Sequence, residues 1–262
     1  MSSRYWDSAA GIGMPGRAIE RRVLEIVASS TRPAYAYGVV QAALLAGALR
    51  IRRVACFELG VGGGEGLLEL ERLGDLLGDE YHVEFQTFGI DGGKGLPQPV
   101  DYRDLPYVWR QGFYKLDESA LKPQLKRGEL WIGDVGEVLE RLFAANIPPV
   151  GFVAFDLDLY SSTASALAAM SHAAIHQFLP RTICYFDDTV GSHEELHSEW
   201  TGELLAISEF NASSSRRKMA KINGLRYKLM SLDAPWVDGM YALHLFDHAE
   251  YATYVFPEAN RQ

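Results

Sequence analysis

The sequence predicts an α/β fold in which a mostly parallel sheet of seven strands carries helices on both faces and is closed by an antiparallel strand. Three observations predict it. Apolar runs typical of strands alternate with segments of helical period, as in a parallel sheet. A glycine-rich turn follows the first of these runs, and the last two predicted strands have no helical period between them. We therefore expect a parallel sheet that ends in an antiparallel pair.

Two helices are predicted to precede the first strand, within residues 15–49, because the apolar positions there have helical spacing. We expect them to pack at the sheet edge or over a ligand site. The first strand is predicted at 54–58, and the helix after its glycine turn continues to about Leu77. The second strand ends on Asp91.

Residues 92–128 interrupt this alternation with prolines and aromatic side chains. A long irregular segment in a compact protein often covers a functional site, so we expect a cap beside the site. A purely structural excursion fits the same residues equally well.

The alternation then resumes. In chain order we predict a strand at 130–134, a helix at 135–145, a buried strand at 150–158, a helix from Ser161 or Ser162 to Leu179 before Pro180, a strand at 181–186, a helix from Ser192 to about Phe210, and strands at 221–231 and 240–247.

Composition limits the class of protein. A chain of 262 residues with 48% hydrophobic and 23% charged residues can form one large domain over 1–262. The net charge of -9 argues against nucleic-acid binding and favours a small-molecule substrate. We see no signal peptide and no membrane segment, and we interpret Cys56 and Cys184 as buried thiols, so we expect a cytoplasmic protein. A homo-oligomer is compatible with the sequence.

The glycine turn is the most informative segment. Residues 54–66 form an apolar strand that ends at Glu58 and continues into Gly60, Gly62 and Gly64. A dinucleotide fingerprint would need glycine or alanine at a sixth position that is Glu65 or Leu67 here, and no phosphate-binding loop pattern is present. The remaining pattern resembles the first motif of class I S-adenosylmethionine (SAM) methyltransferases. A tight turn without a ligand is the alternative.

Acidic residues follow five of the predicted strands. They are Glu58, Asp91, Asp134, Asp156 with Asp158, and Asp187 with Asp188. Ligands of open α/β sheets bind at the carboxyl ends of the strands, although an acid can also cap the next helix. Asp156, Asp187 and Asp188 would repel one another unless a cation compensates them, and Mg²⁺ or another hard divalent ion prefers such oxygen ligands. Asp158, two residues after Asp156 on an extended strand, would point the same way and could act as a base.

One short motif suggests a different chemistry. His193, Glu194 and His197 match the H-E-x-x-H pattern of zinc hydrolases. The pattern is short, and it lacks the third histidine of its extended form. We expect instead a charged first helical turn, or a turn from which His193 could touch a substrate.

Taken in order, the motifs resemble a class I SAM-dependent methyltransferase over about residues 50–250. The run from Phe155 to Thr163, followed by residues 185–188, is similar to the macrocin O-methyltransferase-like group, metal-dependent enzymes that methylate sugar hydroxyls of antibiotics. The resemblance implies a Rossmann-like sheet. It also implies that Glu58, Gly60, Gly62 and Gly64 surround the methionine part of SAM, Asp91 holds the ribose and Asp134 faces the adenine. Asp156, Asp187 and Asp188 would bind Mg²⁺, with Asp158 or His193 as the base.

Three hypotheses follow. The leading one is metal-assisted O-methylation of a small-molecule hydroxyl on a sugar-like or natural-product acceptor, with SAM as donor. The second is a SAM- or nucleotide-binding module without catalysis. The third is a zinc hydrolase that uses His193 and His197.

Overall fold

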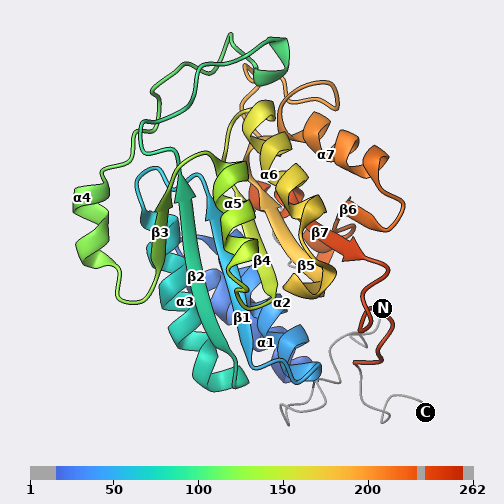
Figure 1. Ribbon diagram of the computed structural model, residues 1–262. Coiled ribbons are helices and arrows are strands. Elements are labelled where there is room, and N and C mark those ends of the chain that lie inside the picture. The colour runs from blue at the N-terminus through green and yellow to red at the C-terminus, as the bar shows by residue number, and fades with distance from the viewer. Residues whose placement is uncertain (1–15, 229–233, 256–262) are drawn as a thin grey trace.

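The computed structural model describes residues 16–228 and 234–255, and within them it shows one seven-stranded sheet of order β3-β2-β1-β4-β5-β7-β6 (Figure 1). The strands are β1 (Arg53–Leu59), β2 (Glu84–Asp91), β3 (Glu129–Ile132), β4 (Val150–Phe155), β5 (Phe178–Phe186), β6 (Arg217–Lys221) and β7 (Met240–Leu245). The first five are parallel, and β7 runs antiparallel to both β5 and β6. The predicted fold class is confirmed.

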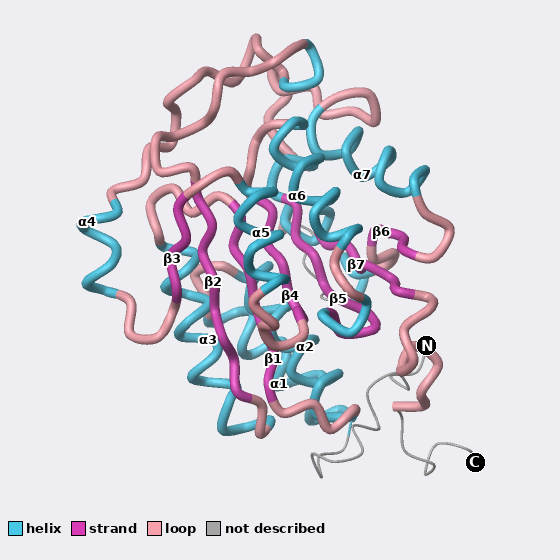
Figure 2. The backbone as a smooth tube through the Cα atoms, in the orientation of Figure 1, coloured by secondary structure: helices cyan, strands magenta, loops and turns pink. Residues whose placement is uncertain are grey.

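Helices cover both faces of this sheet (Figure 2). They are α1 (Gly16–Ser29), α2 (Pro33–Ala48), α3 (Glu65–Tyr81), α4 (Glu118–Leu121), α5 (Val135–Ala144), α6 (Tyr160–His172), α7 (Gly202–Ser213) and α8 (Leu225–Lys228). One face carries α1 to α3 and the other carries α5 to α7. Within residues 16–228 and 234–255, none of the helices is long and apolar enough to cross a bilayer.

The side chains of β4 show why the sheet needs both layers. Every residue of this strand is buried. Phe152 and Ala154 belong to the core under α2 and α3, whereas Val153 and Phe155 belong to the core under α5 and α6. Because successive strand residues point to opposite faces, an apolar run of this kind can be satisfied only between two helical layers.

The two predicted N-terminal helices are confirmed as α1 and α2. A Cβ atom at Gly38 would lie 2.1 Å from the Phe152 ring, so α2 packs closely on the face of the sheet and not at its edge. This packing directs the first residues of α2 toward the carboxyl ends of the strands.

The prediction that a helix extends to Leu179 was wrong at the C-terminal end, because α6 ends at His172 and β5 begins at Phe178. Pro180 lies inside β5. The pairing of β4 with β5 shifts register between Val150 and Phe152, so the strand is irregular where proline offers no N–H donor.

Two further predictions were wrong. Residues 192–201 contain turns and bends, and α7 begins only at Gly202. Leu196 and Gly202 have positive φ angles of 52° and 57°, which a continuous α-helix does not accommodate. The strand predicted at 221–231 is β6 at Arg217–Lys221, and Leu225–Lys228 is helical; residues 229–231 of that prediction lie outside the described residues. Strand β7 confirms the other member of the predicted closing pair.

Candidate functional site

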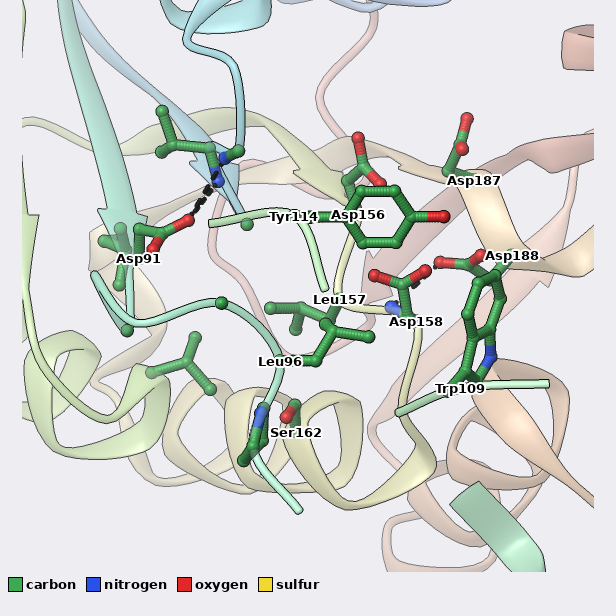
Figure 3. Close-up of a pocket in the computed structure, with 18 of the residues that line it drawn as sticks. Asp91, Leu96, Trp109, Tyr114, Asp156, Leu157, Asp158, Ser162, Asp187 and Asp188 are labelled. Carbon is green, nitrogen blue, oxygen red and sulfur yellow. Dashed lines mark hydrogen bonds between the residues drawn. The ribbon is translucent and has the colours of Figure 1, made fainter. Parts of the chain in front are cut away.

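A cavity of about 760 Å³ opens at the carboxyl edge of the sheet (Figure 3). Residues that follow each of the five parallel strands line it, as expected for ligand sites of open α/β sheets. The lining includes most of the site residues predicted from the sequence, namely Gly60, Gly62, Asp91, Asp134, Asp156, Asp158, Asp187 and Asp188. Glu58, Gly64 and His193 do not line this cavity.

The glycine turn forms one wall of the cavity. Gly60 has a φ of 84°, and a Cβ there would lie 1.8 Å from the carbonyl oxygen of Asp156, so only glycine lets the two loops meet. A Cβ at Gly62 or Gly63 would meet nothing within 4 Å, which leaves their backbone open to a ligand. Gly64 serves another purpose: it caps α3 with a φ of 87°.

Asp91 holds this turn in shape. Its Oδ2 accepts hydrogen bonds from the backbone N–H groups of Val61, at 2.9 Å, and Gly62, at 3.1 Å. Its Oδ1 accepts one from Gly93 at 2.6 Å. The carboxylate at the end of β2 therefore ties the loops after β1 and β2 together beside the cavity.

Asp134 has a structural task as well. Its Oδ1 accepts hydrogen bonds from the N–H groups of Gly136 and Glu137 at 3.0 and 3.2 Å, which caps α5. Asp134 therefore caps the helix that follows it, as one of the two interpretations of the sequence predicts. It also lines the cavity, where a ligand could reach it.

Glu58 lies behind the glycine turn, only 1% exposed. Its Oε1 accepts a 2.9 Å hydrogen bond from the Tyr35 hydroxyl, and its Oε2 has no hydrogen-bond partner within the described part of the chain. Burial raises the pKa of this carboxyl to about 8, so it is mostly protonated at neutral pH. Its position allows it to support the turn from behind and not to contact a ligand directly.

The strongest electrostatic feature is a cluster of three carboxylates, those of Asp156, Asp158 and Asp188. One oxygen of each lies within 4.8 Å of the others. Burial, together with Asp187, raises the pKa of Asp156 to about 7. Burial and the neighbouring acids also raise the pKa of Asp158 to about 7 and that of Asp188 well above its usual range. Arg32 acts on the pKa of Asp156 in the opposite direction, but burial and Asp187 outweigh it. The oxygen donors of the cluster fit a hard divalent cation.

The cluster differs from the predicted metal set in one member. Asp187 is exposed, and its Oδ1 accepts a hydrogen bond of 2.5 Å from the Tyr185 hydroxyl, whereas Asp158 takes its place beside Asp156 and Asp188. The expectation that Asp156 and Asp158 share an extended strand was wrong. Strand β4 ends at Phe155, and Asp158 has a φ of 59° with its N–H donating to Asp188 Oδ2 at 2.9 Å.

The histidine motif does not assemble a metal site. The side chain of His193 is 91% exposed, and its Nε2 lies 2.9 Å from Oε1 of Glu194. The side chain of His197 is 8% exposed, and its Nε2 lies 3.1 Å from Oε2 of Glu195. Because residues 192–201 are not helical, these imidazoles do not share a helix face, and the zinc-hydrolase hypothesis loses its geometric basis.

Several lining residues were not predicted as site residues. Trp109 and Tyr114 come from the 92–128 insertion, Glu195 from the loop after β5, and Arg32 from the residue before α2. The indole Nε1 of Trp109 is buried without a hydrogen-bond partner in the described ranges. The aromatic content of the insertion was the available signal for Trp109 and Tyr114, whereas the sequence around Arg32 carries none.

The insertion and the loop after β5 meet at this cavity. The Tyr107 hydroxyl donates to the backbone oxygen of Glu195 at 2.9 Å. Burial and the acids Asp158, Asp188, Asp156 and Glu195 raise the pKa of Tyr114, whose ring stands beside the cluster in Figure 3. These contacts place the insertion beside the site, and its action as a lid stays a prediction.

Comparison of the sequence with protein-family models gave no match, and comparison with curated proteins gave none. Among solved structures, the fold is similar to the calicheamicin methyltransferase CalS11, with 18% identity, a TM-score of 0.55, and coverage of 88% of this chain and 93% of that one. A second structure, the apo form of CalS11 described as a TDP-rhamnose 3'-O-methyltransferase, has 17% identity, a TM-score of 0.47, and coverage of 88% and 95%. The first similarity shows a shared fold.

Proposed function

We propose that this chain, which has the Rossmann-like fold of a class I SAM-dependent methyltransferase, transfers a methyl group from SAM to a hydroxyl of a small molecule with the help of a divalent cation. One observation carries the proposal: the glycine turn and the acid cluster open into the same cavity. A donor on the turn would therefore lie beside a site that can hold both a cation and an acceptor hydroxyl.

The strand order supports an orientation for the donor. Along the sheet edge Asp134 follows β3, Asp91 ends β2, the glycine turn follows β1 and Asp156 follows β4. With Asp134 at the adenine and Asp91 at the ribose, the amino-acid end lies at the turn between β1 and β4. The sulfonium then faces the acid cluster, where the acceptor would bind.

We assign the cation to Asp156 and Asp188, which belong both to the predicted metal set and to the assembled cluster. One or two carboxylates suffice for Mg²⁺, which keeps several of its waters. A bound cation would favour the deprotonated form of an acceptor hydroxyl. Asp158, in the same cluster, is the residue we assign to accept the hydroxyl proton.

The protein's own contribution is positioning and exclusion of water. SAM supplies an already activated methyl group, so the barrier is lowered mainly by holding donor and acceptor in line. The open backbone of Gly62 and Gly63 would bind the donor, and Trp109 and Tyr114 would cover the acceptor. For the acceptor we propose a sugar-like or natural-product hydroxyl, in keeping with the resemblance to the macrocin group and with the fold shared with a calicheamicin methyltransferase.

The direct test is thermal unfolding with S-adenosylhomocysteine, the demethylated donor, with and without Mg²⁺. A ligand that binds only the folded state at 100 times its Kd stabilises it by about 2.7 kcal/mol. Each kcal/mol raises the melting temperature of a protein of this size by about 2–4 °C, so the expected shift is about 5–10 °C. We expect stabilisation by the donor product, and a separate Mg²⁺ effect that Asp188→Asn removes. No shift with the donor product would overturn the proposal, and a donor shift with neither a Mg²⁺ effect nor turnover would favour the non-catalytic binding module.

Two asparagine variants separate the roles of Asp158 and Asp187. These are the two acids by which the cluster in the structure differs from the metal ligands predicted from the sequence. Asp158→Asn should retain Mg²⁺ and donor affinity within about threefold and lose about 10²–10⁴-fold in methyl transfer, because it removes the base. Asp187→Asn is the matched control at the exposed acid. Calorimetric titration of Mg²⁺ decides the assignment: if Asp158→Asn abolishes cation binding, Asp158 is a ligand and not the base.

A further inference from the structure

Arg32 places a guanidinium in the cavity wall beside the glycine turn. It immediately precedes α2, whose close packing on β4 through Gly38 brings this residue to the carboxyl edge of the sheet. Its side chain is 36% exposed, and its Cζ atom lies 5.8 Å from the centre of the Tyr35 ring. The guanidinium is thus held against an aromatic surface at the cavity.

The contacts of this guanidinium leave donors for a ligand. Within the described residues its ion-pair partner is Glu65, at 3.5 Å, and the Glu65 side chain is 82% exposed. An exposed ion pair at that distance is weak and readily exchanged. Arginine has five N–H donors in a planar arrangement that matches a carboxylate.

The neighbours of Arg32 place it at one end of the cavity. Glu65 is the first residue of α3, directly after the glycine turn, and Asp156 and Glu58 are close enough to act on Arg32 electrostatically. Glu58 lies in β1, Glu65 comes after the turn that follows β1, and Asp156 follows β4. The two lysines of the cavity wall lie elsewhere in the chain: Lys94 and Lys115 both belong to the 92–128 insertion.

We infer that Arg32 binds the carboxylate at the amino-acid end of the methyl donor. The inference depends on the proposed function, because it needs a ligand that combines a nucleoside with a free amino acid. Such a ligand would present its carboxylate at the turn between β1 and β4, where the cavity wall carries this guanidinium. Arg32 would act as a positioning residue and contact no reacting atom.

The test compares two ligands by calorimetric titration. S-adenosylhomocysteine has the amino-acid end, and 5′-methylthioadenosine has the nucleoside and sulfur without it. We expect Arg32→Gln to weaken S-adenosylhomocysteine by at least about tenfold, as for loss of a charge-assisted hydrogen bond, and to change methylthioadenosine by less than about twofold. Arg32→Lys should recover only part of the loss, because an ammonium cannot form the bidentate pair.

Lys115→Gln is the matched control, since it removes another cation from the same wall. It should affect both ligands equally or not at all. An equal loss of both ligands in Arg32→Gln, or no loss of either, would overturn the inference while leaving the proposed function intact. If the unmodified protein binds neither ligand, the proposed function fails and this inference with it.

Discussion

At the residue scale, Glu58 shows how burial changes the chemistry of an acid that the sequence places at a strand end. Its carboxyl lies behind the glycine turn, with the Tyr35 hydroxyl as its hydrogen-bond partner. A Cβ at Gly66 would lie 1.7 Å from Glu58 Oε1, so the turn and α3 close over this group. The acid that the glycine motif predicts as a ligand is here part of the support for the turn.

This burial predicts a pH-dependent stability. The folded-state pKa of Glu58 is raised to about 8, so between the usual carboxyl pKa and that value the folded protein holds a proton that the unfolded chain has lost. The free energy of unfolding should therefore fall as pH rises through that window, by about 1.4 kcal/mol per pH unit for this group. Urea unfolding from pH 5 to 8 should show a shallower fall for Glu58→Gln. Parallel curves for the two proteins would contradict the prediction.

At the element scale, the glycine turn combines two demands at different positions. Gly60 permits contact between the loop after β1 and the loop after β4, whereas Gly62 keeps the backbone accessible from the cavity. The same residue type therefore serves folding at one position and binding at the other.

The two glycines give a matched pair of variants. Gly60→Ala should destabilise the fold by about 2 kcal/mol or more, because it adds a clash with the Asp156 carbonyl to the cost of a positive φ. Gly62→Ala, with a φ of 48° and nothing within 4 Å, should cost about 1 kcal/mol and mainly weaken S-adenosylhomocysteine. Urea unfolding and ligand titration measure the two effects. Equal stability losses would show that the Gly60 contact has no energetic consequence.

The loop after β5 is the element that sequence reasoning described least well. Its polar residues were assigned to the first turns of a long helix, but Tyr107 of the insertion bonds to the Glu195 backbone, and Ser192 N–H donates to the Glu195 side chain at 2.6 Å. The non-helical conformation of this loop thus goes together with a contact to Tyr107, more than 80 residues earlier in the chain. Local periodicity does not specify such a conformation.

At the scale of the whole molecule, strand order arranges the proposed ligand parts along one edge of the sheet. In the proposed orientation, the nucleoside end would face β3 and β2, and the amino-acid end would face β1 and β4. Because the sheet core on both faces is continuous behind this edge, the separate binding groups are held at fixed spacing.

This arrangement predicts that Asp91 and Arg32 affect different parts of the donor. Asp91→Asn should weaken both S-adenosylhomocysteine and methylthioadenosine by about tenfold, since it acts at the nucleoside they share. Asp91 also holds the turn through Val61 and Gly62, so the melting temperature of the unliganded variant must be measured as a control. Unchanged methylthioadenosine affinity would mean that the donor lies in another orientation.

The sequence by itself determined the α/β class, the parallel strands and the edge where acids gather. These features depend on local periodicity and on the position of each acid relative to its own strand, which a chain carries without reference to distant residues. Strand β4 is the plainest case, because its uninterrupted apolar run already requires a helical layer on each side.

Only the tertiary structure decided which of those groups meet. Asp158 joins Asp156 and Asp188 because its backbone turns to a positive φ and its N–H donates to a carboxylate 30 residues later. Arg32 reaches the cavity because α2 packs tightly on β4. Both outcomes depend on contacts between segments far apart in the chain. Neither the positive φ of a single residue nor the packing of a helix on a distant strand leaves a periodic signal in the sequence.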